Sequence, residues 1–148
     1  MRRKILGAVL RVSLLLAITG VLQAEGKKKG DAPLEKTEWR LIWLSGAKIE
    51  EAAPQQAPYI QLDSDSHRVS GSGGCNRLMG GYELAGDHLK FTRMAMTRMA
   101  CAHGGYTEAA FAKALDHVTS WKIVKGKLLL FDVDLRVLAK FTAYTPES

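Results

Sequence analysis

The sequence contains none of the short motifs that commonly mark catalytic or metal-binding sites. Its two cysteines are not in a CxxC spacing and no HxxxH spacing occurs, which excludes the usual zinc sites. The GxxxxGK(S/T) pattern of a phosphate-binding loop is also absent. No two carboxylates stand out as an acid–base couple, because Asp63 and Asp65 belong to a turn signal. We therefore expect no enzyme activity and no cofactor.

The composition is that of one globular domain. The chain has 148 residues, of which 47% are hydrophobic and 24% are charged, and these fractions are not those of a disordered protein. This length is enough to bury a sizeable core without further support. No internal repeat is visible, and we expect a monomer.

The first 24 residues, 1–24, have the layout of a secretory signal peptide. Basic residues at positions 2–4 precede the apolar run 12–22, and the small residue Ala24 follows it. The run is short for a membrane span and Arg11 lies at its start. We therefore expect export to the periplasm or cell envelope, with no stable membrane span once the signal is removed. An uncleaved anchor is the alternative.

Export changes what the net charge means. The formal charge of +6 includes four basic residues of the signal segment, so 17 of the 21 basic residues remain beside 15 acidic residues. Three of those 17 form the lysine run 27–29, within a charged segment with Gly and Pro that predicts a flexible linker over 25–36. No cluster of basic residues on a folded face is apparent, so nucleic acid is not an expected partner.

The remaining chain, 37–144, predicts an α+β domain with a strongly curved antiparallel sheet or an open barrel. In the first strand Trp39, Leu41 and Trp43 fall on one alternation, which predicts that they share a face. Turn residues separate about seven or eight short strands. The segments that predict strands and hairpins are 37–46, 59–63, 67–73, 81–92, 120–124, 127–132 and 136–144.

One helix is expected, over 106–118. Phe111, Leu115 and Val118 are spaced so that one helical face is apolar. Thr107 is a suitable N-cap, and Glu108 suits the positive end of the helix.

The two cysteines, Cys75 and Cys101, allow three interpretations. In an exported protein a single pair is most simply a disulfide, and closing this loop should stabilise the fold by about 3.5 kcal/mol. A nucleophilic cysteine would need a base, for which His103 is nearest in sequence. A copper site would use the thioethers of Met94, Met96 and Met99, although methionines more commonly fill irregular gaps in a core.

Two stretches resemble the signatures of a known family. The stretch GCNRLMGGY, 74–82, is similar to the G-C-N-x-x-x-G-x-Y signature of the META domain, the HslJ-like heat-shock family. The stretch TRMAC, 97–101, is similar to the second signature of that family. The resemblance covers residues 37–144, and its signature residues here are Gly74, Cys75, Asn76, Gly80, Tyr82, Thr97, Arg98, Met99, Ala100 and Cys101.

The resemblance implies a curved antiparallel sheet closed by one helix, a location in the cell envelope, and no established catalysis. In this reading the signature is a structural corner, where Cys75 is pinned to Cys101 and the glycines allow a tight turn.

Our leading hypothesis is an exported, non-enzymatic protein that maintains the envelope under stress by binding a protein or an apolar ligand. The alternatives are an inhibitor or assembly partner of another exported protein, acting through loop 50–58 or 93–99, and a metal-handling or redox protein.

Overall fold

The computed structural model describes residues 31–49, 56–102 and 105–145. The expected signal segment and most of the expected linker lie outside these residues. Within the described residues, no helix is long and apolar enough to cross a membrane.

The described chain forms nine strands and one helix, which confirms the α+β class. The helix α1 spans Gly105–Asp116, so it begins before Thr107, and Thr107 is therefore not its N-cap. The short strand β2 was not expected from the sequence. The strands are β1 Glu38–Leu44, β2 Ala47–Lys48, β3 Tyr59–Asp63, β4 Arg68–Ser72, β5 Arg77–Ala85, β6 His88–Met96, β7 Ser120–Val124, β8 Lys127–Phe131 and β9 Val137–Tyr144.

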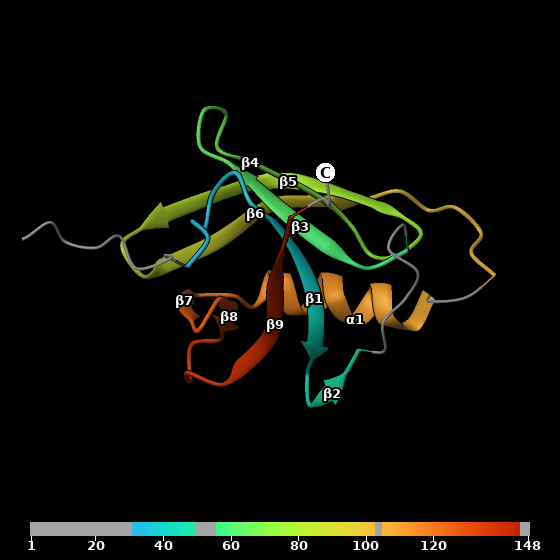
Figure 1. Cartoon of the computed structure of the whole chain (residues 1–148). Helices are drawn as coiled ribbons and strands as arrows, with labels where there is room; N and C mark the ends of the chain where they lie inside the picture. The colour runs from blue at the N-terminus through green and yellow to red at the C-terminus, as the bar shows by residue number, and fades with distance from the viewer. Residues whose placement is uncertain (1–30, 50–55, 103–104, 146–148) are drawn as a thin grey trace, which may run out of the picture.

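The nine strands form one strongly curved antiparallel sheet that closes into an irregular ring (Figure 1). Closure is possible because β1 pairs with both β3 and β9. The join with the fewest paired residues is between β6 and β7, which share the single register pair His88↔Ser120. Helix α1 connects these two strands and packs against β6, β1 and β9.

The core lies between the inner face of the ring and α1. Phe111 of α1 and Phe141 of β9 are fully buried, with ring centroids 6.0 Å apart. Trp39 and Leu41 of β1 also point inward, as the alternation predicts.

Trp43 does not share their face, contrary to the sequence prediction. The register of β1 against β9 shifts between Leu41 and Trp43, which indicates a β-bulge. An extra residue reverses the alternation, so Leu44 is buried and Trp43 lies half-buried on the outer face, beside Lys140.

The packed domain also begins earlier than Thr37. Leu34 is 5% exposed and belongs to the core, although it falls in the expected linker. Its carbonyl accepts a 2.9 Å hydrogen bond from the indole N–H of Trp39. The sequence does not predict this contact, because a single apolar residue among charged ones forms no hydrophobic pattern.

Candidate functional site

The two signature stretches meet around Asn76, whose side chain is 6% exposed. Its Oδ1 accepts hydrogen bonds from the backbone N–H of Met99 at 2.7 Å and from the hydroxyl of Thr97 at 3.0 Å. Its amide Nδ2 donates to a carboxylate oxygen of Glu108 at 2.8 Å. Asn76 therefore joins the start of β5, the segment after β6, and α1. We call this set the signature junction, and its members are Gly73, Cys75, Asn76, Thr97, Met99, Cys101 and Glu108.

Glu108 is the buried anion of the signature junction. It lies in the first turn of α1 and is 4% exposed. Its Oε1 accepts the backbone N–H groups of Cys75 at 2.8 Å and of Asn76 at 2.5 Å. Burial alone would raise the pKa of this carboxyl, but the hydrogen bonds from Asn76 and Cys75 favour the ionised form and hold its pKa below the ordinary value.

The structure brings the sulfur atoms of Cys75 and Cys101 to bonding distance. Their Cα atoms are 6.2 Å apart, within the range that a disulfide requires. The link fixes the turn before β5 to the segment after β6. It therefore closes the signature junction covalently at the place where hydrogen bonds already hold it.

Glycine is required in the turn because the carboxylate approaches so closely. A Cβ atom on Gly73 would lie 2.8 Å from Cγ of Glu108, and Gly74 has a φ of +119°. Gly80 has a comparable role in the sheet, since a Cβ there would lie 2.9 Å from the carbonyl oxygen of Thr92. At Gly73 and Gly80, a neighbouring side chain or backbone atom therefore lies where any other residue would place its Cβ.

The remaining signature residues lie apart from this hydrogen-bond network. Tyr82 is buried, and its hydroxyl donates to the carboxylate of Glu35. Burial and the neighbouring carboxylate raise the pKa of Tyr82. Arg98 and Ala100 are exposed on the segment between Thr97 and Cys101.

The signature junction is built for stability. Its polar groups satisfy one another, and no buried side-chain nitrogen or oxygen among the described residues lacks a hydrogen-bond partner. Sulfur atoms of Cys75 and Cys101 and an oxygen of Glu108 lie within 4.8 Å of one another, which is a spacing that a metal could use. Here the sulfurs are bonded to each other and the carboxylate accepts three hydrogen bonds, so each of these groups already has a bonding partner within the protein.

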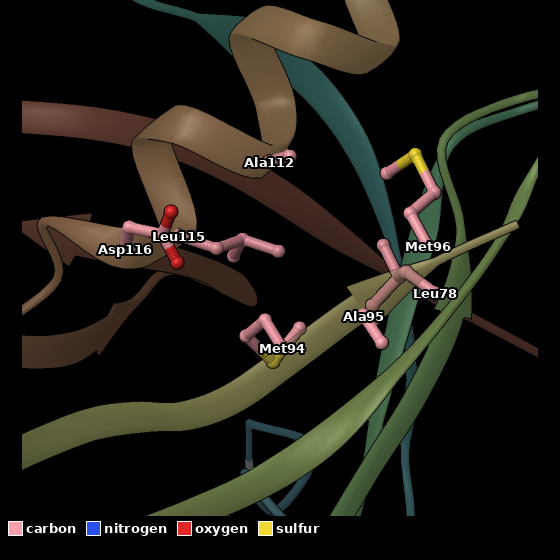
Figure 2. Close-up of a pocket in the computed structure, with 7 residues that line it drawn as sticks. All are labelled: Leu78, Met94, Ala95, Met96, Ala112, Leu115 and Asp116. Atoms are coloured by element: carbon pink, nitrogen blue, oxygen red, sulfur yellow. The ribbon is translucent and has the colours of Figure 1, made fainter. Parts of the chain in front are cut away.

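A small apolar cavity lies beside the junction, between β6 and α1. Figure 2 shows Met94, Ala95 and Met96 of β6 across from the helix. The cavity has a volume of about 80 Å³ and reaches the surface near the exposed residues Ala95 and Asp116. Its full lining is Leu78, Met94, Ala95, Met96, Ala112, Leu115 and Asp116.

The methionines that suggested a copper site differ in their surroundings. Met94 and Met96 line the cavity, whereas Met99 is 58% exposed and lies outside its lining. The stretch 93–99, expected as a binding loop, is also different from the prediction. Residues up to Met96 belong to β6, and Thr97 and Met99 are held by Asn76. His103 and most of loop 50–58 lie outside the described residues.

Sequence reasoning assigned Glu108 only to the helix dipole and missed its central position. A helix that opens with a glutamate is common, and nothing local shows that this carboxylate serves a turn 32 residues earlier in the chain. The nearest signal in the sequence is Gly73, the glycine before the signature, where a side chain would collide with Glu108.

The fold and the signature junction define a small α+β domain in which one helix closes a curved sheet and its first turn anchors the signature. The family model of the META domain matches residues 32–145. The chain belongs to the META domain family. No curated protein matches it.

Three solved structures share the fold. A protein from Burkholderia xenovorans, solved by NMR, is 29% identical, and the match covers 76% of this chain and 85% of that one, with a TM-score of 0.60. A second NMR structure is 23% identical, covers 73% and 90%, and has a TM-score of 0.57. A DUF4847 family protein from Bacteroides vulgatus is 14% identical, covers 77% and 96%, and has a TM-score of 0.54.

Proposed function

We propose that this protein is an exported, non-enzymatic META-domain protein that maintains the cell envelope, including under stress, by binding an apolar side chain of an envelope protein. The apolar cavity between β6 and α1 is the observation that carries the proposal. The sequence layout of residues 1–24 supports export, and the cysteine pair suits an oxidising compartment.

The signature junction supports a role other than catalysis. A nucleophile needs an ionisable thiol and a base in reach, whereas the sulfur atoms of Cys75 and Cys101 are bonded to each other. The carboxylate of Glu108 is kept ionised by hydrogen bonds and is buried, so it is poorly placed to exchange a proton with a substrate.

The size and rim of the cavity favour a side chain over a large ligand. Pockets for drug-sized ligands have volumes of about 300–1,000 Å³, and an apolar cavity of about 150 Å³ holds one benzene ring. A cavity of about 80 Å³ has room for a branched aliphatic group. The carboxylate of Asp116 at the rim would favour a basic group beside it.

Methyl NMR of the full chain tests this binding, with leucinamide as the probe because it joins a branched side chain to an ammonium group. We expect the methyl signals of Met94 and Met96 to shift saturably, while that of exposed Met99 stays in place. The variant Ala112→Leu, which fills the cavity, should lose the shift. Equal movement of all three methyl signals, or a shift that persists in Ala112→Leu, would refute binding at this cavity.

Export is tested separately, by fractionating a bacterial host that expresses all 148 residues. The proposal expects the protein in the periplasmic fraction, with the mass of a chain cut after Ala24. Recovery of the uncut chain in the cytoplasm would contradict export without bearing on the cavity.

A further inference from the structure

The outer face of the closed sheet carries a row of alternating lysine and apolar side chains. Cross-strand pairing places Lys122 of β7 opposite Leu129 of β8, and Leu129 opposite Lys140 of β9. Lys140 is opposite Trp43 of β1, and Trp43 is opposite Lys48 of β2. Directly paired residues on one face have Cβ atoms about 4.5–5.5 Å apart, so these five side chains form a continuous line. We call this line the lysine row.

Aromatic rings hold two cations against this face. The ammonium of Lys140 lies 4.8 Å from the ring centre of Trp43, and the guanidinium of Arg40 lies 3.2 Å from that of Tyr144. Such contacts attract the cation to the face of the ring and restrain its long side chain. The bulge that turns Trp43 outward therefore also positions Lys140.

The charge on these strands is mostly basic. Strands β7, β8, β9, β1 and β2 contain one acidic residue, Glu38, which pairs with Arg40 at 2.9 Å. Within the part of the chain that the structure describes, none of the lysines on these strands forms an ion pair with a carboxylate. The basic residues on these strands are Arg40, Lys48, Lys122, Lys127 and Lys140.

We propose that the lysine row binds a linear anionic polysaccharide, an activity separate from the cavity and independent of it. The row crosses strands, so it runs around the curved sheet and not along it. A flat membrane surface fits a convex row poorly. A flexible chain with repeated anionic groups can follow the curve and meet each lysine in turn.

The aromatic residues favour a glycan over single-stranded nucleic acid. Proteins that bind single strands without sequence preference offer open aromatic faces on which bases stack. Here Lys140 and Arg40 lie over the rings of Trp43 and Tyr144. The cations therefore cover the ring faces on which bases would stack. Recognition by charge suits the carboxylate or sulfate groups of an acidic polysaccharide.

Calorimetric titration of the full chain with a heparin oligosaccharide tests the proposal, using the triple variant K48Q/K122Q/K140Q. The matched control R68Q/K90Q/K113Q removes three exposed charges from β4, β6 and α1. We expect the lysine-row variant to lose about tenfold or more in affinity and to show a weaker salt dependence, while the control stays within about twofold. Both variants should remain folded, as judged by thermal unfolding.

Three results would overturn the proposal. Equal losses in the two triple variants would mean that heparin senses only net charge. Tighter binding of an oligothymidylate of equal charge, or of phosphatidylglycerol vesicles, would assign the row to a different partner. Failure to bind heparin at low salt would remove the site altogether. None of these results concerns the methionine signals that report on the cavity.

Discussion

The signature junction and the lysine row are opposite in how their charges are satisfied. In the junction a buried carboxylate accepts three hydrogen bonds, and the chain is tied there a second time by the disulfide. On the outer face, lysines from three strands stand in line with no carboxylate paired to them among the described residues. The sequence signature of this protein therefore lies where the chain is held together, whereas the lysines of the lysine row lie on other strands.

The largest expected effect is on the covalent half of the junction. Replacing both cysteines, Cys75→Ser with Cys101→Ser, should lower the free energy of unfolding by about 3.5 kcal/mol, because the unfolded chain regains the freedom of a loop of this length. Urea unfolding of the full chain measures it. A loss below about 1 kcal/mol would mean that the hydrogen bonds alone hold the corner.

The variant Glu108→Gln tests the ionic half. Glutamine keeps one oxygen that can accept the backbone N–H groups of the turn, but its NH2 group would then face the Nδ2 donor of Asn76. A buried donor loses its acceptor and the remaining hydrogen bonds lose their charged partner, so we expect a loss of about 3 kcal/mol. Heparin affinity should not change. The exposed control Glu83→Gln should leave stability within about 0.5 kcal/mol. Equal unfolding midpoints for Glu108→Gln and Glu83→Gln would mean that the carboxylate of Glu108 does not stabilise the fold.

Acid should weaken the junction in a defined direction. The folded-state pKa of Glu108 lies below its ordinary value of 4.5, so its ionised form contributes stability at neutral pH. That contribution is lost as the pH falls below about 4.5 and through the folded-state pKa. The difference in unfolding free energy between the unmodified protein and Glu108→Gln should therefore shrink with acid. A difference that is constant from pH 7 to pH 3 would exclude this linkage.

A second carboxylate, Asp132, organises a turn by contacts that are all local in sequence. Asp132 accepts hydrogen bonds from the backbone N–H groups of Asp134 and Arg136 at 2.9 Å, and it pairs with the guanidinium of Arg136. The variant Asp132→Asn should reduce stability less than Glu108→Gln does, because its turn joins only β8 to β9 and its partners lie within four residues. The same urea experiment ranks the two, and a larger loss at Asp132 would reverse our account of which turn matters.

The smallest effect on stability is expected from the lysine row. The triple variant K48Q/K122Q/K140Q removes no ion pair among the described residues and one cation–π contact, that of Lys140 with Trp43, so unfolding should change by no more than about 1 kcal/mol while heparin affinity falls. A large loss of stability would mean that the row is structural, like the junction.

Sequence reasoning predicted the features of this fold that depend on local patterns. The alternation in β3 to β9 and the apolar spacing of Phe111 and Leu115 predicted the curved sheet with one helix. The cysteine pair, being the only one, could be matched without a structure. The hydrophobic patterns lie within single elements, and two cysteines can pair in only one way.

The features that escaped prediction depend on contacts between distant residues. The bulge that turns Trp43 outward arises in the pairing with β9, about a hundred residues away. The sequence of β1 contains no local signal that predicts a bulge. Lys48, Lys122 and Lys140 are scattered in sequence and become neighbours only through strand register, which is why no basic cluster was visible. Glu108 is separated from Asn76 by 32 residues for the same reason.

The most direct test of the account is an acid titration of the full chain followed by the amide proton shifts of Cys75 and Asn76. Both amides donate to the same oxygen of Glu108, so we expect both signals to move together as that carboxyl is protonated, with one midpoint below 4.5. Neither signal should show this step in Glu108→Gln. Amide signals that stay fixed through the titration, or that move with separate midpoints, would contradict the claim that a buried carboxylate holds the signature together.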